Sequence, residues 1–155
     1  MTVPDLRYYR VPDIKADNNK QMIRMTLEPL MNASLAIQVH TAAAISAFGI
    51  GVVQIAGRKG SISHRTLGWL WVGLMVIVAA TGFFIHEIRM FGPWSPIHLL
   101  SIAVLIQLPI AVIAARRHNI RVHRSFMLGM FAGALVVAGL FTFLPGRILG
   151  RVVFG

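Results

Sequence analysis

Histidine is the residue type in this sequence whose spacing is most suggestive of chemistry. Each half of the chain carries a His, then two basic residues 18 positions later, then a His-Arg pair. In the first half these are His40, Arg58 with Lys59, and His64 with Arg65. In the second half they are His98, Arg116 with Arg117, and His123 with Arg124. Imidazole nitrogens are ligands for haem iron, zinc and copper, so the repeated spacing is compatible with paired ligand sites.

The elements that must position these histidines are membrane-spanning helices. Hydrophobic residues make up 56% of the chain and charged ones 13%, and beyond Glu28 the only acidic residue is Glu87. Four uncharged segments follow one another, at 29–57, 66–85, 90–115 and 125–146. Each is long enough to cross the bilayer, which takes roughly 20 helical residues. The predicted fold is all-α, a four-helix transmembrane bundle with spans at about 31–57, 65–86, 96–115 and 124–145.

The two halves share one plan, so the bundle is predicted to consist of two duplicated helical hairpins. A symmetry axis along the membrane normal would bring His40 opposite His98 and His64 opposite His123. Helical rise places the His40 and His98 pair roughly 27 Å from the basic loops, near the outer edge of the hydrocarbon. The other pair stays near the inner edge. Two facing imidazoles at each end of a dry bundle are the arrangement that binds a low-spin b-type haem.

Charge divides the chain into a polar tail, residues 1–28, and a membrane domain, residues 29–155. The tail could lie along the membrane interface as a short helix. The loops 58–65 and 116–124 hold three and four basic residues. This excess predicts that both loops are cytoplasmic and that both termini are periplasmic. Trp69 and Trp71 on one side, and Trp94 on the other, are expected in the aromatic belts at the two membrane surfaces.

Several functional classes are excluded by composition. The net charge of +10 does not indicate nucleic-acid binding, because the basic residues sit at the ends of apolar runs, where lipid headgroups and topology explain them. The absence of cysteine excludes disulfides and ordinary iron–sulfur clusters. No nucleophile, base and orienting group occur together, and no phosphate-cradling glycine loop is present, so no catalytic residue is predicted. Membrane oxidoreductase activity is the one enzymatic possibility left open.

Other interpretations of the histidines remain open. His86 could join His40 and His98 in an outer zinc or copper site, although three helices would have to aim their rings at one point. Each histidine could also be a structural residue that hydrogen-bonds inside the bundle. His118 is expected to face water in its basic loop. Polar side chains within the spans are expected to hydrogen-bond between helices: Gln38, Gln54, Thr81 and Gln107.

The order of the histidines also resembles a known family. "QVHTAAAISAFGIG", "SHRTLGWLWVG", "SPIHLLS" and "VHRSFMLGMFAG" resemble the four core helices of the cytochrome b561 family. That resemblance implies one haem b held by His40 with His98 and a second held by His64 with His123. It also offers a counterpart for His86. Members of that family usually have six helices, whereas four are predicted here.

A second resemblance covers the whole chain. The segments "SPIHLLS" and "FTFLPGRILGRVVFG" are similar to a bacterial family of small four-helix integral membrane proteins. This resemblance implies the bacterial inner membrane and no particular activity.

Together these features predict electron transfer through the membrane by two bis-histidine b haems, with a quinone or a redox partner subunit at either face. The alternative is a haem-free integral membrane subunit or scaffold, acting in a larger complex or as a homodimer, with structural histidines. A metal or proton transporter that uses the outer histidines is a third possibility.

Overall fold

The structure is a computed structural model of the 155-residue chain, and it describes residues 27–85 and 96–154. Four helices in this part are long and apolar enough to cross a membrane: Leu35–Ala56, Ile62–Gly82, Pro96–Arg116 and Ile120–Phe141. They are labelled α3, α4, α5 and, for the last, the sequence α6 (Ile120–Met130), η2 (Phe131–Val137) and α7 (Ala138–Phe141). The predicted all-α membrane fold is confirmed.

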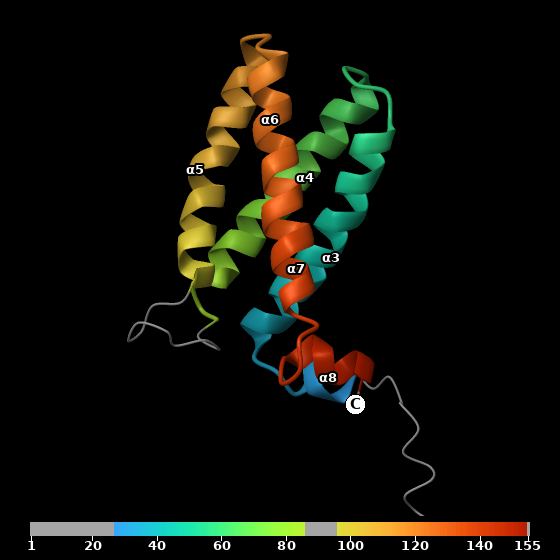
Figure 1. Cartoon of the computed structure of the whole chain (residues 1–155). Helices are drawn as coiled ribbons and strands as arrows, with labels where there is room; N and C mark the ends of the chain where they lie inside the picture. The colour runs from blue at the N-terminus through green and yellow to red at the C-terminus, as the bar shows by residue number, and fades with distance from the viewer. Residues whose placement is uncertain (1–26, 86–95, 155) are drawn as a thin grey trace, which may run out of the picture.

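Two short helices complete the described part of the chain. Helix α2 (Glu28–Met31) precedes α3, and helix α8 (Ile148–Phe154) follows the fourth span. They pack against each other at the end of the bundle where the described chain begins and ends (Figure 1). We call this the terminal end. Residues 1–26 of the predicted tail at 1–28, and the outer-loop residues 86–95 with Trp94, lie outside the described residues.

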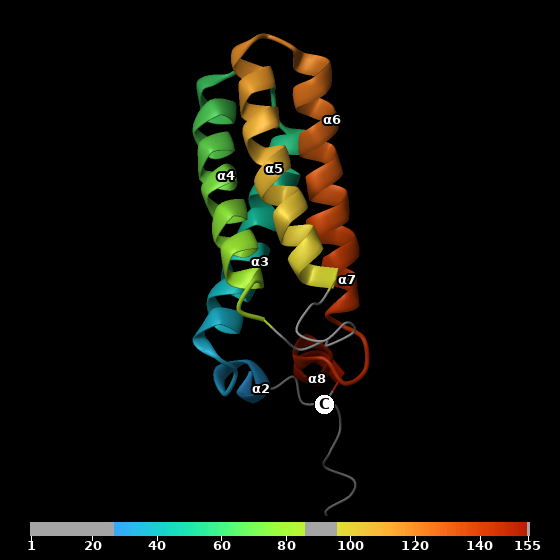
Figure 2. The ribbon, with the colours of Figure 1, turned by 90° about the vertical axis from the view of Figure 1, so that its left-hand side faces the viewer.

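The four spans form two antiparallel hairpins that lie side by side (Figure 2). Around the bundle, α3 packs against α4, α4 against α5, α5 against α6, and η2 against α3. The connections 57–61 and 117–119 both lie opposite the terminal end (Figure 1), and we call that end the loop end. In this order α3 and α5 occupy one diagonal of the bundle, and α4 and α6 occupy the other.

Two helices begin a few residues before the predicted spans, and capping side chains explain why. Ser61 caps α4 by accepting a hydrogen bond on its hydroxyl from the His64 backbone N–H at 3.1 Å. Asn119 caps α6 in the same way, accepting from the Val122 N–H at 3.2 Å. Polar caps of this kind satisfy N–H groups that have no partner within the helix. As a result, His64 and His123 lie in helical first turns.

The middle of the bundle is filled by a continuous apolar core. Its largest fully buried side chains are Trp71 and Met75 on α4, and they pack with Leu108 and Met130 from the other hairpin. The expectation that Trp71 lies in an interfacial belt is wrong, because only 2% of its surface is exposed. It occupies the inward face of α4, one turn before Met75. Trp69 is 55% exposed and lies under the Arg116 guanidinium, 5.7 Å from the ring centroid, as an interfacial residue can.

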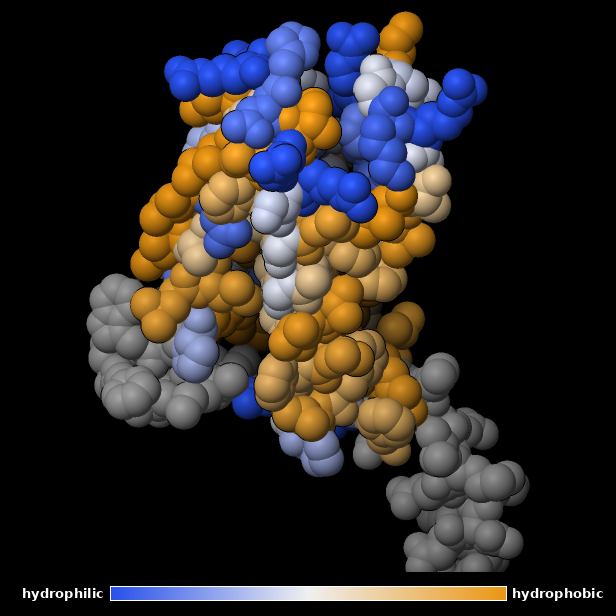
Figure 3. Space-filling model, turned by 45° about the horizontal axis from the view of Figure 1, so that its top comes forward, coloured by the Kyte–Doolittle hydropathy of each residue, from blue (hydrophilic) through white to orange (hydrophobic). Residues whose placement is uncertain are grey.

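The outer surface has the polarity of a membrane protein. Exposed aliphatic side chains cover the sides of the spans, including Ile45, Val53, Leu105 and Ile106. Hydrophilic residues gather over the loop end (Figure 3). The basic residues there are Arg58, Lys59, Arg65, Arg116, Arg117, Arg121 and Arg124. Because these apolar sides need a nonpolar solvent, the helices contact the lipid bilayer.

Candidate histidine sites at the two ends of the bundle

His40 joins α3 to the last turns of α4. Its Nδ1 lies 3.0 Å from the backbone oxygen of Val78 and 3.0 Å from the hydroxyl oxygen of Thr81. A carbonyl oxygen can only accept, so the Val78 contact requires the proton on Nδ1. In the neutral ring this leaves a lone pair on Nε2. A histidine held in this way has the tautomer that suits metal ligation through Nε2.

His98 lies at the start of α5 and is 4% exposed. Its Nε2 lies 3.3 Å from the backbone oxygen of Phe83, just beyond the end of α4, and its ring lies 6.0 Å from the Phe83 ring. The carbonyl contact places the proton on Nε2 rather than Nδ1. His98 thus adopts the opposite tautomer from His40. Both rings contact the end of α4, one from α3 and the other from α5, and their direct pairing stays a prediction.

His123 ties α6 to α5 at the loop end. Its Nδ1 lies 2.9 Å from the backbone oxygen of Ala111, a fully buried residue on α5. The same reasoning as for His40 puts the proton on Nδ1 and leaves the lone pair on Nε2. The ring is therefore oriented by a neighbouring helix, with its second nitrogen available.

His64 lies on α4, and its ring contacts differ from those of the other three candidate ligands, His40, His98 and His123. Its backbone is held at both polar groups, because its N–H donates to Ser61 and its carbonyl accepts from the Gln54 amide nitrogen at 2.9 Å. Its ring makes no hydrogen bond within the described part of the chain, and Nδ1 is buried. His64 and His123 lie within electrostatic range of each other. The loop end thus brings together one anchored imidazole and one without a protein partner.

The remaining polar residues fall into three groups. Gln54 and Thr81 hydrogen-bond between spanning helices, as predicted, through His64 and His40. Gln38 instead bonds the backbone oxygens of Met31 and Ala33, next to α2. The Gln107 side chain makes no hydrogen bond in the part of the chain that the structure describes, so its predicted interhelical bond is wrong.

The outer metal site predicted from three histidines is not tested. His86 lies outside the described residues, and among the described ones no three His, Cys, Asp or Glu side chains come close enough to hold a metal ion. His118 is exposed in the loop between α5 and α6, as expected, and has a positive φ of 55°.

The backbone partners of the histidines were not evident from the sequence. Val78 and Ala111 contribute only their carbonyl oxygens, and no residue type marks such a group. Trp71 could have been assigned to the core from the spacing of Trp71, Met75 and Ala79, which places the three side chains on one helical face. Its indole Nε1 is buried and has no hydrogen-bond partner among the residues that the structure describes.

The fold and its histidines define a small four-helix integral membrane protein with polar clusters at both ends of an apolar core. The chain belongs to the family described as "Predicted membrane protein (DUF2306)", whose model matches residues 37–153. Neither a curated protein nor a solved structure matches the chain. The family match establishes which family the chain belongs to, whereas the resemblance to the cytochrome b561 core stays a prediction.

Proposed function

We propose that this protein is a b-type cytochrome that carries electrons across the membrane through two haems. One haem is held by His64 and His123 at the loop end, and the other by His40 and His98 at the terminal end. The observation that carries the proposal is the His123 ring, which is anchored through Nδ1 and lies within electrostatic range of His64, whose own ring makes no hydrogen bond in the described part of the chain. Bound haem b would supply reversible one-electron oxidation and reduction of its iron.

The residues at the loop end fit a bis-histidine iron site. A ligating histidine commonly donates its other ring N–H to a backbone carbonyl, as His123 does to Ala111. A buried imidazole nitrogen without a partner, as in His64, is costly unless something occupies it. The two residues come from α4 and α6, which occupy one diagonal of the bundle. Ligands from opposite sides are what a planar macrocycle requires.

At the terminal end, only one of the two histidines has the arrangement of a haem ligand. His40 is anchored through Nδ1 and offers Nε2, as His123 does. His98 uses Nε2 in its contact with the Phe83 carbonyl, so ligation through that atom requires the contact to be exchanged. The long apolar core between the two ends, with Trp71 and Met75 at its centre, would exclude water from the path between the haems.

The charge pattern indicates which face of the membrane each end of the bundle occupies. The basic loop end is assigned to the cytoplasm of a bacterial cell, and the terminal end to the outer face of the inner membrane. The electron donor and acceptor would then meet the protein at opposite faces. A membrane quinone or the redox subunit of a larger complex could serve in either role.

Optical spectroscopy tests this proposal. Protein expressed with ample haem and purified in detergent should show reduced-minus-oxidised bands of b haem, with two haems per chain by the pyridine haemochrome assay. His64→Ala and His123→Ala should each remove the same haem, and His40→Ala and His98→Ala the other. His118→Ala is the matched control and should keep both, because this residue is exposed in a loop. Protein that is folded but colourless would overturn the proposal.

A haem-free membrane subunit is the second candidate, and one observation favours it. His40, His98 and His123 each contact a backbone carbonyl of a neighbouring segment, which is also how structural histidines hold helices together. In that case each His→Ala variant would lower stability without any spectroscopic change. His64→Ala would be the least destabilising, because its ring bonds no protein group in the described part of the chain.

A further inference from the structure

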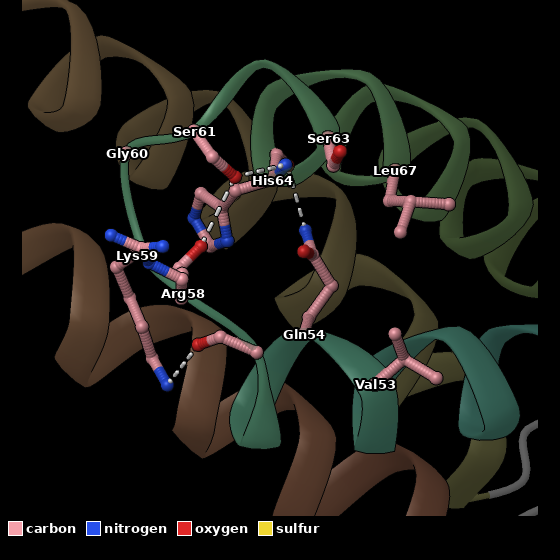
Figure 4. A pocket seen from close by; sticks show the side chains of 10 residues that line it. Val53, Gln54, Arg58, Lys59, Gly60, Ser61, Ser63, His64 and Leu67 are labelled. Carbon is pink, nitrogen blue, oxygen red and sulfur yellow. Dashed lines mark hydrogen bonds between the residues drawn. The ribbon is translucent and has the colours of Figure 1, made fainter.

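A second polar site lies beside the loop-end histidines. A pocket of about 580 Å³ opens between the end of α3 and the start of α4. Figure 4 shows Arg58, Lys59, Ser61 and His64 around it, with Gln54 reaching across from α3. Arg58, Lys59 and Gln54 carry N–H donors that suit an anion, whereas the single hydroxyl proton of Ser61 is donated to the Arg58 backbone oxygen at 3.2 Å.

The two cations of the pocket differ in whether their hydrogen-bond donors already bind groups of the protein. The Lys59 ammonium donates to the backbone oxygens of Ile55 and Gly57, where it caps the end of α3. The Arg58 guanidinium makes no hydrogen bond or ion pair within the described part of the chain. Its planar group has five N–H donors and matches the oxygens of a phosphate. Arg58 is therefore the pocket cation whose N–H donors remain available to bind an anion.

No protein carboxylate in the described part of the chain balances this charge. Seven basic residues lie at the loop end, and the single described acidic residue, Glu28, lies in α2 at the terminal end (Figure 1). A set of positive charges beside a low-dielectric membrane attracts anions from solution or from lipid headgroups.

Local geometry adds to this attraction. The 21-residue helix α4 begins at the pocket, so its first N–H groups and the positive end of its dipole lie there. His64 also lines the pocket, but its ring belongs to the proposed iron site and is not counted among the groups that bind the phosphate.

We propose that this pocket binds a phosphate group, with Arg58 as its principal cation. The phosphate could belong to an anionic phospholipid headgroup or be free in solution. The position favours lipid, because Val53, an apolar residue that lines the pocket, exposes 55% of its surface and could contact an acyl chain. This site does not depend on haem, since none of its contacts requires iron.

The test compares two charge-matched double variants of the full chain in detergent. Arg58→Gln with Lys59→Gln removes the pocket cations, whereas Arg117→Gln with Arg121→Gln removes two exposed cations at the same end. The probes are phosphatidylglycerol, phosphatidylcholine with the same acyl chains, and inorganic phosphate. Bound lipid is counted by native mass spectrometry, and stabilisation is measured as the shift in melting temperature.

Wild-type protein and the control variant should bind phosphatidylglycerol at least about tenfold more tightly than the pocket variant, since charge-assisted contacts to phosphate are lost. Preference for phosphatidylglycerol over phosphatidylcholine identifies a lipid phosphate. Stabilisation by inorganic phosphate alone, again lost only in the pocket variant, identifies a free one. Equal weakening in both double variants, or no binding of either probe, overturns the proposal. Haem content should be unchanged in both variants, so failure here is separate from failure of the cytochrome proposal.

Discussion

The imidazole of His123 donates a hydrogen bond from Nδ1 to the backbone oxygen of Ala111, 2.9 Å away on the preceding span. This single contact determines that Nε2, rather than Nδ1, is the ring nitrogen that can bind a metal ion. It also fixes the direction in which that nitrogen points, because Ala111 belongs to the packed core. The loop end thus holds an oriented imidazole within electrostatic range of His64, in a strongly basic surface.

If the loop end holds haem as proposed, its basic surface should raise the reduction potential of that haem. Arg65 and Arg124 directly follow the two histidines, and positive charge disfavours the oxidised iron. Arg65→Gln or Arg124→Gln should lower the potential of this haem by roughly tens of millivolts, because an exposed charge is partly screened. Redox titration of the visible bands measures the change. The terminal-end haem should keep its potential, and an equal shift in both haems would contradict the assignment.

The contact between Thr81 and His40 should contribute to stability. Thr81→Val removes the hydroxyl that lies 3.0 Å from Nδ1 and keeps the shape of the side chain. A loss of about 0.5–1 kcal/mol is expected, as is usual for one hydrogen bond between membrane helices. Thr66→Val is the control, because Thr66 is exposed on the same helix. Unfolding in mixed detergent measures both variants, and equal losses would show that the bond contributes nothing specific.

The approach of α3 to η2 should depend on Gly51. A methyl group at this position would lie 2.5 Å from the Phe131 ring and 3.1 Å from the indole nitrogen of Trp71. Gly51→Ala should therefore destabilise the bundle by about 1–3 kcal/mol, the usual cost of overpacking. Gly49→Ala meets nothing within 4 Å and should be neutral or slightly stabilising. Gly51→Ala combined with Phe131→Leu should recover part of the loss. Equal thermal stability of the two alanine variants would contradict this packing.

Single cysteines can establish which face of the membrane holds the loop end. The chain has no native cysteine, and Ser63 and Ser34 are exposed at the loop end and the terminal end. If the basic loops are cytoplasmic, Ser34→Cys should react with an impermeant maleimide in intact cells, and Ser63→Cys only after permeabilisation. The reverse pattern would exchange the faces assigned to the two ends.

The sequence predicted the four spans because the property that makes a helix cross lipid is a long run without charge, which composition reveals directly. The pairing of His64 with His123 followed from the duplicated spacing of the two halves and stays a prediction. The anchoring carbonyls of Val78 and Ala111 could not be predicted, since they depend on how each helix is rotated against its neighbour. Trp71 lies close to the basic loop in the sequence, which predicts a place in the interfacial belt, but its spacing from Met75 and Ala79 turns its side chain into the core.

The π-helical segment η2 gives the fourth span one residue more than α-helical geometry would need. Met130 and Leu135 are five positions apart, yet both are buried in the core. The wide turns between them keep both side chains on one face. Deleting one residue from Phe131–Val137 should convert the segment to ordinary α-helix and keep the helix on both sides in phase. The same deletion in α5 would turn half of that helix by about 100° and carry its core face towards lipid. The fourth span therefore contains a place where chain length can change without loss of register.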